Sequence, residues 1–102
     1  MGINGWGHEF DGPYPDPNDL SDDPGVYLIE CVDNNGRTIL DVGESDNVKD
    51  RVLNHDRRDC WRENCQGRIY YSAAYMIYTP EEERRELESR IRNSENVICG
   101  ER

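Results

Sequence analysis

Lysine is almost missing from this chain, in which Lys49 is the single lysine beside 11 arginines. Acidic residues outnumber basic ones by 22 to 12, and the formal net charge is −10. A negative chain repels polyanions, so broad electrostatic binding of nucleic acid is disfavoured. Arginine suits bidentate contacts with phosphate, but it is equally common in surface ion pairs, which we expect for most of these side chains.

Long apolar segments are also absent, and none approaches the roughly 18 residues that a membrane-spanning helix requires. The amino terminus lacks the basic segment followed by an apolar one that is typical of a secretory signal. We therefore expect no membrane association and a cytoplasmic location.

The cysteines contain no C-x-x-C pair, and nothing in the sequence directs them to an oxidising compartment. Free thiols are the expectation for all four, Cys31, Cys60, Cys65 and Cys99. The alternative is a zinc site that uses Cys60, Cys65, His55 or Cys99, although the spacing of Cys60 and Cys65 is poor for structural zinc.

Two β-prone runs are the clearest structural signal. Residues 24–32 and 37–45 are rich in apolar and β-branched side chains, and the loop at 33–36 contains the Asn and Gly that tight hairpin turns favour. Apolar residues occupy both alternating sets of each run, which predicts a hairpin covered on both faces.

The segments around this hairpin complete a single small domain of 102 residues. Residues 1–23 are acidic and rich in Pro and Gly, which predicts an irregular extension that is anchored in part by its aromatic side chains, Trp6, Phe10 and Tyr14. After the hairpin we expect a helix over 47–57, a polar link over 56–67 with Trp61 buried, and a strand over 68–78.

Helix caps define the remaining boundaries. Ser45 or Asp46 is expected to cap the first helix, and Thr79 is expected to cap a second helix that runs to about Arg92 and has Glu82 in a capping box. The predicted fold class is α+β, with a small three-stranded antiparallel sheet flanked by helices.

Three side chains on these helices are candidates for chemistry. Arg51 and His55 lie four residues apart and share one face of the first helix. The alternative is that Arg51 forms a solvent-exposed ion pair with Asp50 or Glu44 and that His55 is an ordinary surface imidazole. On the second helix, Glu88 lies beside the apolar stripe, where a divalent ion would compensate its charge.

The alternative for Glu88 is an ion pair with Arg84, four residues earlier, worth about 0.3 kcal/mol.

The two strand motifs resemble the paired signature of the GIY-YIG nuclease superfamily. Gly25-Val26-Tyr27 is similar to its Gly-Ile-Tyr motif, and Asp41-Val42-Gly43-Glu44-Ser45 is similar to its Tyr-Ile-Gly-x-Ser/Thr motif. The expected order of strand, strand, helix, strand and helix also resembles this family, and the resemblance covers residues 24 to about 100. We therefore expect a GIY-YIG-like domain at 24–102 after the extension at 1–23.

The resemblance implies a metal-dependent endonuclease that hydrolyses DNA phosphodiester bonds. It implies that Glu88 holds one Mg²⁺ (or Mn²⁺) and that Tyr27 orients or deprotonates the attacking water. It further implies that Arg51 holds a phosphate oxygen, and that His55 relays a proton or donates a hydrogen bond, as a near-neutral pKa would permit.

Two positions depart from the family pattern. Asp41 stands where the second motif begins with Tyr, and an acid there could accept a proton or touch the metal, so Asp41 is included among the catalytic candidates. Gly100 stands where many members carry Asn. An alternative is therefore a catalytically impaired binding or regulatory module with the same fold.

Partners follow from the same features. DNA is the expected partner, bound weakly by the acidic chain alone, and a protein partner could supply positive surface. The six carboxylates within residues 1–24 could instead lie across the phosphate-binding cleft and inhibit it, or form a solvated tail.

Overall fold

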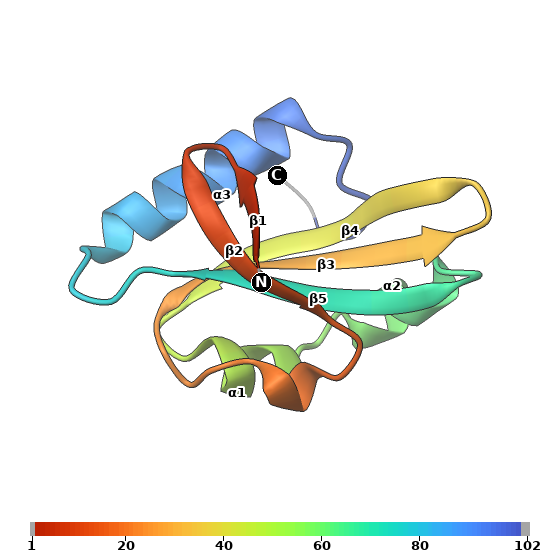
Figure 1. Cartoon of the computed structure of the whole chain (residues 1–102), viewed down its shortest axis with the longest axis horizontal. Coiled ribbons are helices and arrows are strands. Elements are labelled where there is room, and N and C mark those ends of the chain that lie inside the picture. Colours follow the sequence, from red (N-terminus) through yellow and green to blue (C-terminus); the bar gives the residue numbers. More distant parts are fainter. Residues whose placement is uncertain (1, 101–102) are drawn as a thin grey trace.

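An antiparallel sheet of five strands forms the centre of the computed structural model, which describes residues 2–100. The strand order is β1-β2-β5-β3-β4. Helix α3 lies on one face, and α1 and α2 lie on the other (Figure 1). The α+β class is thus confirmed, although the sheet has five strands where three were predicted. The strands are β1 (Gly2–Gly5), β2 (His8–Tyr14), β3 (Gly25–Asp33), β4 (Gly36–Ser45) and β5 (Arg68–Tyr75).

The predicted hairpin is formed by β3 and β4. Its turn is stabilised by the Asp33 side chain, which accepts the N–H of Asn35 at 2.8 Å, and Gly36 adopts a φ of +119° that favours glycine. A bulge in β4 places Asp41 opposite Ile29, on the sheet face that α1 and α2 cover.

The prediction of irregular structure for residues 1–23 was wrong, because much of this segment joins the sheet. Strand β2 pairs with β5 at Asp11 and Tyr14, and β1 pairs with β2. Gly12 and Pro13 lie at the irregularity between those two pairs, where Gly12 has a φ of +115°. These residues interrupt the strand pairing locally and do not prevent it.

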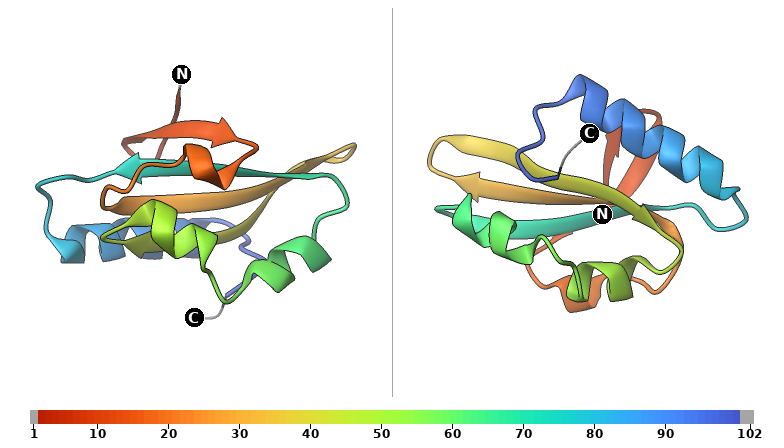
Figure 2. Two further views of the ribbon diagram at one scale, coloured as in Figure 1. Left: turned by 90° about the horizontal axis from the view of Figure 1, so that it is seen from below. Right: turned by 180° about the vertical axis from the view of Figure 1, so that it is seen from behind.

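Residues 1–23 also contribute to the hydrophobic cores, since Phe10 and Leu20 are both buried. Strands β1 and β2 occupy the sheet edge opposite β4, and Figure 2 shows this arrangement from two further sides. The acidic side chains of β2 therefore lie away from β4, whereas residues 21–23 contact α1 through the N–H groups of Val48 and Lys49, so the autoinhibition hypothesis stays a prediction.

A second short helix replaces part of the predicted polar link. Helix α1 (Val48–Leu53) ends earlier than predicted, and α2 (Arg58–Glu63) follows it. Between them the ring Nδ1 of His55 accepts the N–H of Arg57 at 3.0 Å, a side-chain bond that competes with helical pairing. Helix α2 then buries Trp61, as predicted.

The observed helix caps differ from the predicted ones. Asn47, and neither Ser45 nor Asp46, caps α1 by accepting the N–H of Asp50 at 3.1 Å. Helix α3 (Glu81–Ser94) begins without the predicted capping box, because the Thr79 hydroxyl donates to the carbonyl two residues earlier. No helix within residues 2–100 is long and apolar enough to cross a membrane.

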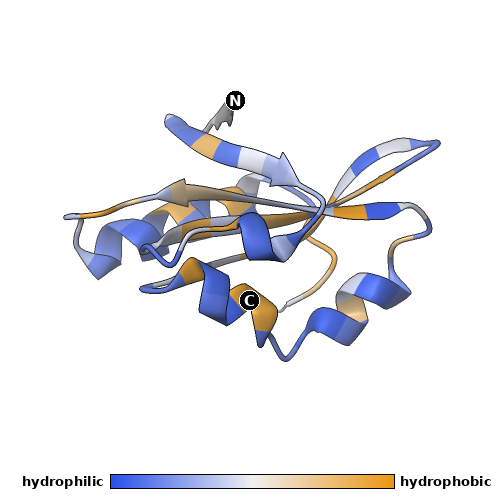
Figure 3. Cartoon of the chain, turned by 60° about the horizontal axis from the view of Figure 1, so that its bottom comes forward, coloured by the Kyte–Doolittle hydropathy of each residue, from blue (hydrophilic) through white to orange (hydrophobic). Residues whose placement is uncertain are grey.

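Two hydrophobic cores cover the two faces of the sheet, which confirms that the hairpin is buried on both sides. Figure 3 shows that hydrophobic residues concentrate in the strands, whereas the helices are largely hydrophilic with short hydrophobic stretches. The core beneath α1 and α2 includes Tyr27, Ile29, Leu40, Val52 and Trp61. The core beneath α3 includes Phe10, Val26, Leu28, Val42, Leu87 and Ile91.

The prediction of free thiols was wrong, because the four cysteines form two disulfides, Cys31–Cys65 and Cys60–Cys99. The partners are 34 and 39 residues apart in sequence, so local spacing carries no sign of the pairing. No thiolate remains for the alternative zinc site. The second disulfide joins α2 to the carboxyl-terminal segment, which pairs with the outer edge of β4 through the N–H of Cys99 on the Leu40 carbonyl at 2.6 Å.

Candidate active site

Tyr27 lies on β3 directly opposite Gly43 on β4. Its ring passes over the glycine so closely that a Cβ on Gly43 would lie 2.2 Å from the phenol oxygen. Glycine is therefore the residue that lets the phenol take this position. Tyr27 of the first strand motif and Gly43 of the second are thus in direct packing contact.

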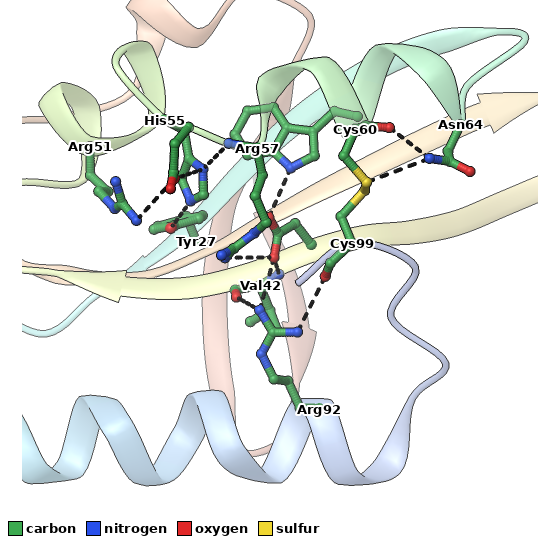
Figure 4. Close-up of polar contacts among 12 residues, drawn as sticks. Tyr27, Val42, Arg51, His55, Arg57, Cys60, Asn64, Arg92 and Cys99 are labelled. Carbon is green, nitrogen blue, oxygen red and sulfur yellow. Dashed lines mark hydrogen bonds and ion pairs between the residues drawn. A yellow bond between two sulfur atoms is a disulfide. The ribbon is translucent and has the colours of Figure 1, made fainter. Parts of the chain in front are cut away.

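Tyr27 and His55 form a buried hydrogen-bonded pair. The His55 Nε2 lies 2.8 Å from the Tyr27 hydroxyl oxygen (Figure 4). Because Nδ1 accepts the backbone N–H of Arg57, the ring proton of the neutral imidazole belongs on Nε2, which donates to the phenol oxygen. The phenol proton is then left to donate to another acceptor.

Burial perturbs both members of this pair. It raises the pKa of Tyr27 to about 12, while the positive charge of Arg51 acts in the opposite direction. It lowers the pKa of His55 to about 4, and Arg51 and Arg57 act in the same direction. The near-neutral pKa expected for His55 was therefore wrong, because its side chain is enclosed and lies near two cations. Both side chains are neutral at pH 7.

Asp41 is a fully buried carboxylate that holds two arginines. Arg57 Nε donates to Oδ2 at 2.8 Å, and Arg92 Nη2 donates to Oδ1 at 2.9 Å. The Trp61 indole N–H also donates to Oδ2 at 2.8 Å, and the N–H of Val42 donates to Oδ1 at 2.9 Å. These donors compensate the burial of the charge. These hydrogen bonds give Asp41 a structural role, and its oxygens are not exposed to solvent.

Arg51 and Glu88 are the more exposed members of the candidate set. The Arg51 side chain is 41% exposed and lies 3.6 Å from Asp56, so neither predicted ion-pair partner is used. Glu88 is 24% exposed and accepts from Arg92 Nε at 3.3 Å. The ion pair of Glu88 with Arg84, which was the alternative to a metal, is not formed, because Arg84 turns to Glu44 on β4 at 3.1 Å.

The five predicted residues, Tyr27, Asp41, Arg51, His55 and Glu88, form one connected region. Tyr27 and His55 touch, and the charges of Arg51 and Glu88 both act on the phenol. Two residues that the sequence analysis missed supply the remaining links, because Arg57 connects the region to Asp41 and Arg92 connects Asp41 to Glu88. The Glu88–Arg92 spacing, with the acid four residues before the base, is the signal that could have identified Arg92.

The candidate residues suit a metal ion that binds the protein through one carboxylate. Among the described residues there is no group of three or more His, Cys, Asp or Glu that could hold an ion. Mg²⁺ often binds to one or two carboxylates and completes its shell with water and substrate phosphate oxygens. Glu88, which is partly exposed and has one cationic partner among the described residues, suits that mode, whereas the enclosed Asp41 does not.

Two surface hollows lie elsewhere. One is at the β3–β4 turn and includes Asn34 and Arg68 in its lining, and another includes Pro15 and Tyr71. Neither is lined by any of the five residues, so the candidate site rests on the side-chain constellation. Comparison of this chain with protein-family models, with curated proteins and with solved structures finds no match.

Proposed function

We propose that this chain is a metal-dependent endonuclease of the GIY-YIG type that hydrolyses DNA phosphodiester bonds. The observation that carries the proposal is the Tyr27–His55 hydrogen bond beside the charges of Arg51 and Glu88. A phenol, a guanidinium and a carboxylate from three separate elements are thus grouped near the β4 edge of the sheet. Hydrolysis of a phosphodiester uses such groups to orient water and to stabilise charge on phosphate oxygens.

Glu88 is the metal ligand in this proposal. A bound Mg²⁺ or Mn²⁺ would stabilise the negative charge that develops on the leaving and non-bridging oxygens. Arg92 holds the Glu88 carboxylate in position, since its own side chain is almost enclosed and anchored on Asp41. Arg51 is free enough to turn from Asp56 to a phosphate oxygen, because both partners are exposed and such pairs contribute little stability.

Tyr27 orients the attacking water in this proposal as a neutral phenol, and because this residue is 1% exposed, the water has to be admitted to the phenol when DNA binds. With a pKa near 12 the phenol carries a proton at pH 7 and acts as a hydrogen-bond donor. His55 fixes the phenol by donating to its oxygen. Proton relay by His55 is not part of the proposal, because an imidazole with a pKa of about 4 stays neutral during turnover at pH 7.

Cleavage assays with matched variants test this function. The protein should nick or cut DNA at low salt when Mg²⁺ or Mn²⁺ is added, and Glu88→Gln and Arg51→Ala should each lower the rate at least about 100-fold. Glu86→Gln, which removes an exposed carboxylate from the same helix, should keep the wild-type rate. A folded protein that cleaves no duplex, branched or single-stranded DNA with either metal would refute the proposal.

One observation favours the second candidate, a GIY-YIG-fold module that binds a partner without cleavage. The Asp41 oxygens are occupied by Arg57, Arg92 and Trp61, so this residue cannot take the role of the motif tyrosine. Calorimetric titration with Mn²⁺ separates the two candidates. The nuclease requires a site that Glu88→Gln removes, whereas the module requires no metal binding at Glu88.

A further inference from the structure

The Arg57 guanidinium is anchored along one edge and open at its outer end. Its Nε and Nη2 donate to the two oxygens of Asp41 at 2.8 and 3.3 Å. Within the part of the chain that the structure describes, Nη1 makes no hydrogen bond, and the side chain is 32% exposed. The N–H groups at the outer end therefore have no partner among residues 2–100 and are available to an acceptor from outside the chain.

Arg92, the other arginine on Asp41, differs in this respect. Its Nε donates to Glu88, its Nη1 to the Cys99 carbonyl, and its Nη2 to Asp41 and the Val42 carbonyl. Its side chain is only 4% exposed. Arg92 thus uses all its nitrogens within the fold, and of the two arginines on Asp41 only Arg57 has a nitrogen without a described partner.

Arg57 also lies next to the Tyr27–His55 pair. Its backbone N–H donates to His55, and its side chain reaches from the same loop to Asp41 (Figure 4). The positive charge of Arg57 acts on both the phenol and the imidazole. A phosphate held at the outer end of Arg57 would therefore lie near the groups that the proposed function uses.

We propose that Arg57 is a second phosphate-binding residue of this site and that Asp41 is its positioning residue. The inference rests on the proposed function for the identity of the ligand, a phosphodiester of DNA. Asp41 accepts from Nε and from one N–H of Nη2, which leaves the two N–H groups of Nη1 and the second N–H of Nη2 for phosphate oxygens. Asp41 stands where the family's second motif has a tyrosine. In place of that phenol, the site thereby gains the Arg57 cation that Asp41 orients.

DNA binding without cleavage tests the role of Arg57. The affinity for a labelled DNA duplex is measured by fluorescence anisotropy in Ca²⁺ over a range of NaCl concentrations. Arg57→Ala should weaken binding about tenfold and should lower the slope of log K against log salt by about 1. Arg62→Ala removes the same charge from α2, where its described partner is the exposed Asp59, and should leave the slope unchanged.

Coupling between Asp41 and Arg57 tests the positioning role. Asp41→Asn should weaken DNA binding, and adding Arg57→Ala to that variant should weaken it little further, because the cation is already released. Additive losses would show that Asp41 affects DNA binding independently of Arg57 and would overturn its positioning role. Thermal unfolding of each variant identifies any that fail to fold, and Arg57→Lys, which keeps the charge but loses the planar fork, then serves as the second variant.

The outcomes separate this inference from the proposed function. If the wild type cleaves DNA, and Arg57→Ala alters neither the salt slope nor KM, the inference fails while the endonuclease stands. If the wild type binds DNA with the expected dependence on Arg57 but never cleaves it, the inference stands and the endonuclease fails. If the wild type neither binds nor cleaves DNA, both fail.

Discussion

At the scale of single residues, the site depends on close packing between side chain and backbone. Gly43 makes room for the Tyr27 ring, and the enclosed His55 fixes the phenol oxygen. Asp41 holds a buried negative charge that two guanidinium groups compensate. We therefore expect a substitution at each of these residues to change stability, apart from any effect on catalysis.

Gly43→Ala is expected to destabilise the fold by about 2 kcal/mol, because the new methyl group overlaps the Tyr27 ring and forces the strands or the ring to shift. Urea unfolding measures the change. Gly5→Ala is the matched control, since nothing lies within 4 Å of a Cβ at that position, and it should change stability by less than about 0.5 kcal/mol. Equal effects at the two sites would contradict the packing described for Gly43.

His55 is expected to make stability fall as the pH drops below neutrality. Burial lowers its pKa from 6.5 to about 4, so the unfolded chain binds a proton in this range while the folded chain does not. The full contribution is present above about pH 6.5, and roughly 2 kcal/mol should be lost by pH 5. Urea unfolding at the two pH values measures this loss.

His55→Gln should remove that part of the pH dependence, whereas His8→Gln, at the other histidine, should retain it. The comparison between variants separates His55 from the carboxylates that also titrate in acid. An unchanged pH dependence in His55→Gln would show that the imidazole is solvated in the native protein.

At the scale of elements, the outer edge of β4 is closed by parts of the chain that are remote in sequence. Arg92 of α3 bonds to the Val42 carbonyl, and the N–H groups of Ile98 and Cys99 bond to carbonyls of β4. An edge strand with unpaired carbonyls is a site for unwanted pairing, so this cover protects the sheet. The Cys60–Cys99 disulfide fastens the covering segment to α2.

Removal of the Cys60–Cys99 disulfide is expected to destabilise the protein by up to about 4 kcal/mol, as the entropy of closing a loop of this size implies. Urea unfolding of Cys60→Ser measures the loss. Cys31→Ser opens a loop of similar length and should cost a similar amount, but only Cys60→Ser should expose the β4 backbone to hydrogen exchange. Peptide mapping without reduction checks both pairings, and a different pairing would refute them.

At the scale of the whole molecule, negative charge is in excess. The chain carries a net charge of −10, yet the candidate site gathers three arginines, Arg51, Arg57 and Arg92. The three arginines attract an anionic ligand that reaches the site, whereas the net negative charge of the molecule repels polyanions in general. Binding of DNA should therefore require low salt or a partner that supplies positive surface.

Salt is expected to stabilise the fold. Raising NaCl from about 0.1 M to about 1 M screens the repulsion among the excess carboxylates, and the gain should exceed the loss from exposed ion pairs. The melting temperature should rise by several degrees in calorimetry. A melting temperature that falls with NaCl would show that the ion pairs matter more than the net charge.

Local patterns predicted part of the fold and part of the site. The hairpin, the strand at β5 and the helix at α3 follow from composition and alternation along short segments, and these elements are present. His55 and Glu88 were predicted from their positions on the expected helices and Tyr27 from the resemblance of its strand motif, and the structure groups them in one region. Their roles in chemistry stay proposals.

The amino acid sequence by itself determined where the chain turns, which runs extend and which side chains carry charge, because these properties depend on near neighbours. Only the tertiary structure decided that β1 and β2 join the sheet, that the cysteines pair, and that Asp41 holds Arg57 and Arg92. The physical reason is that these contacts join residues far apart in the chain. Their energies arise only when the sheet and the helices pack together.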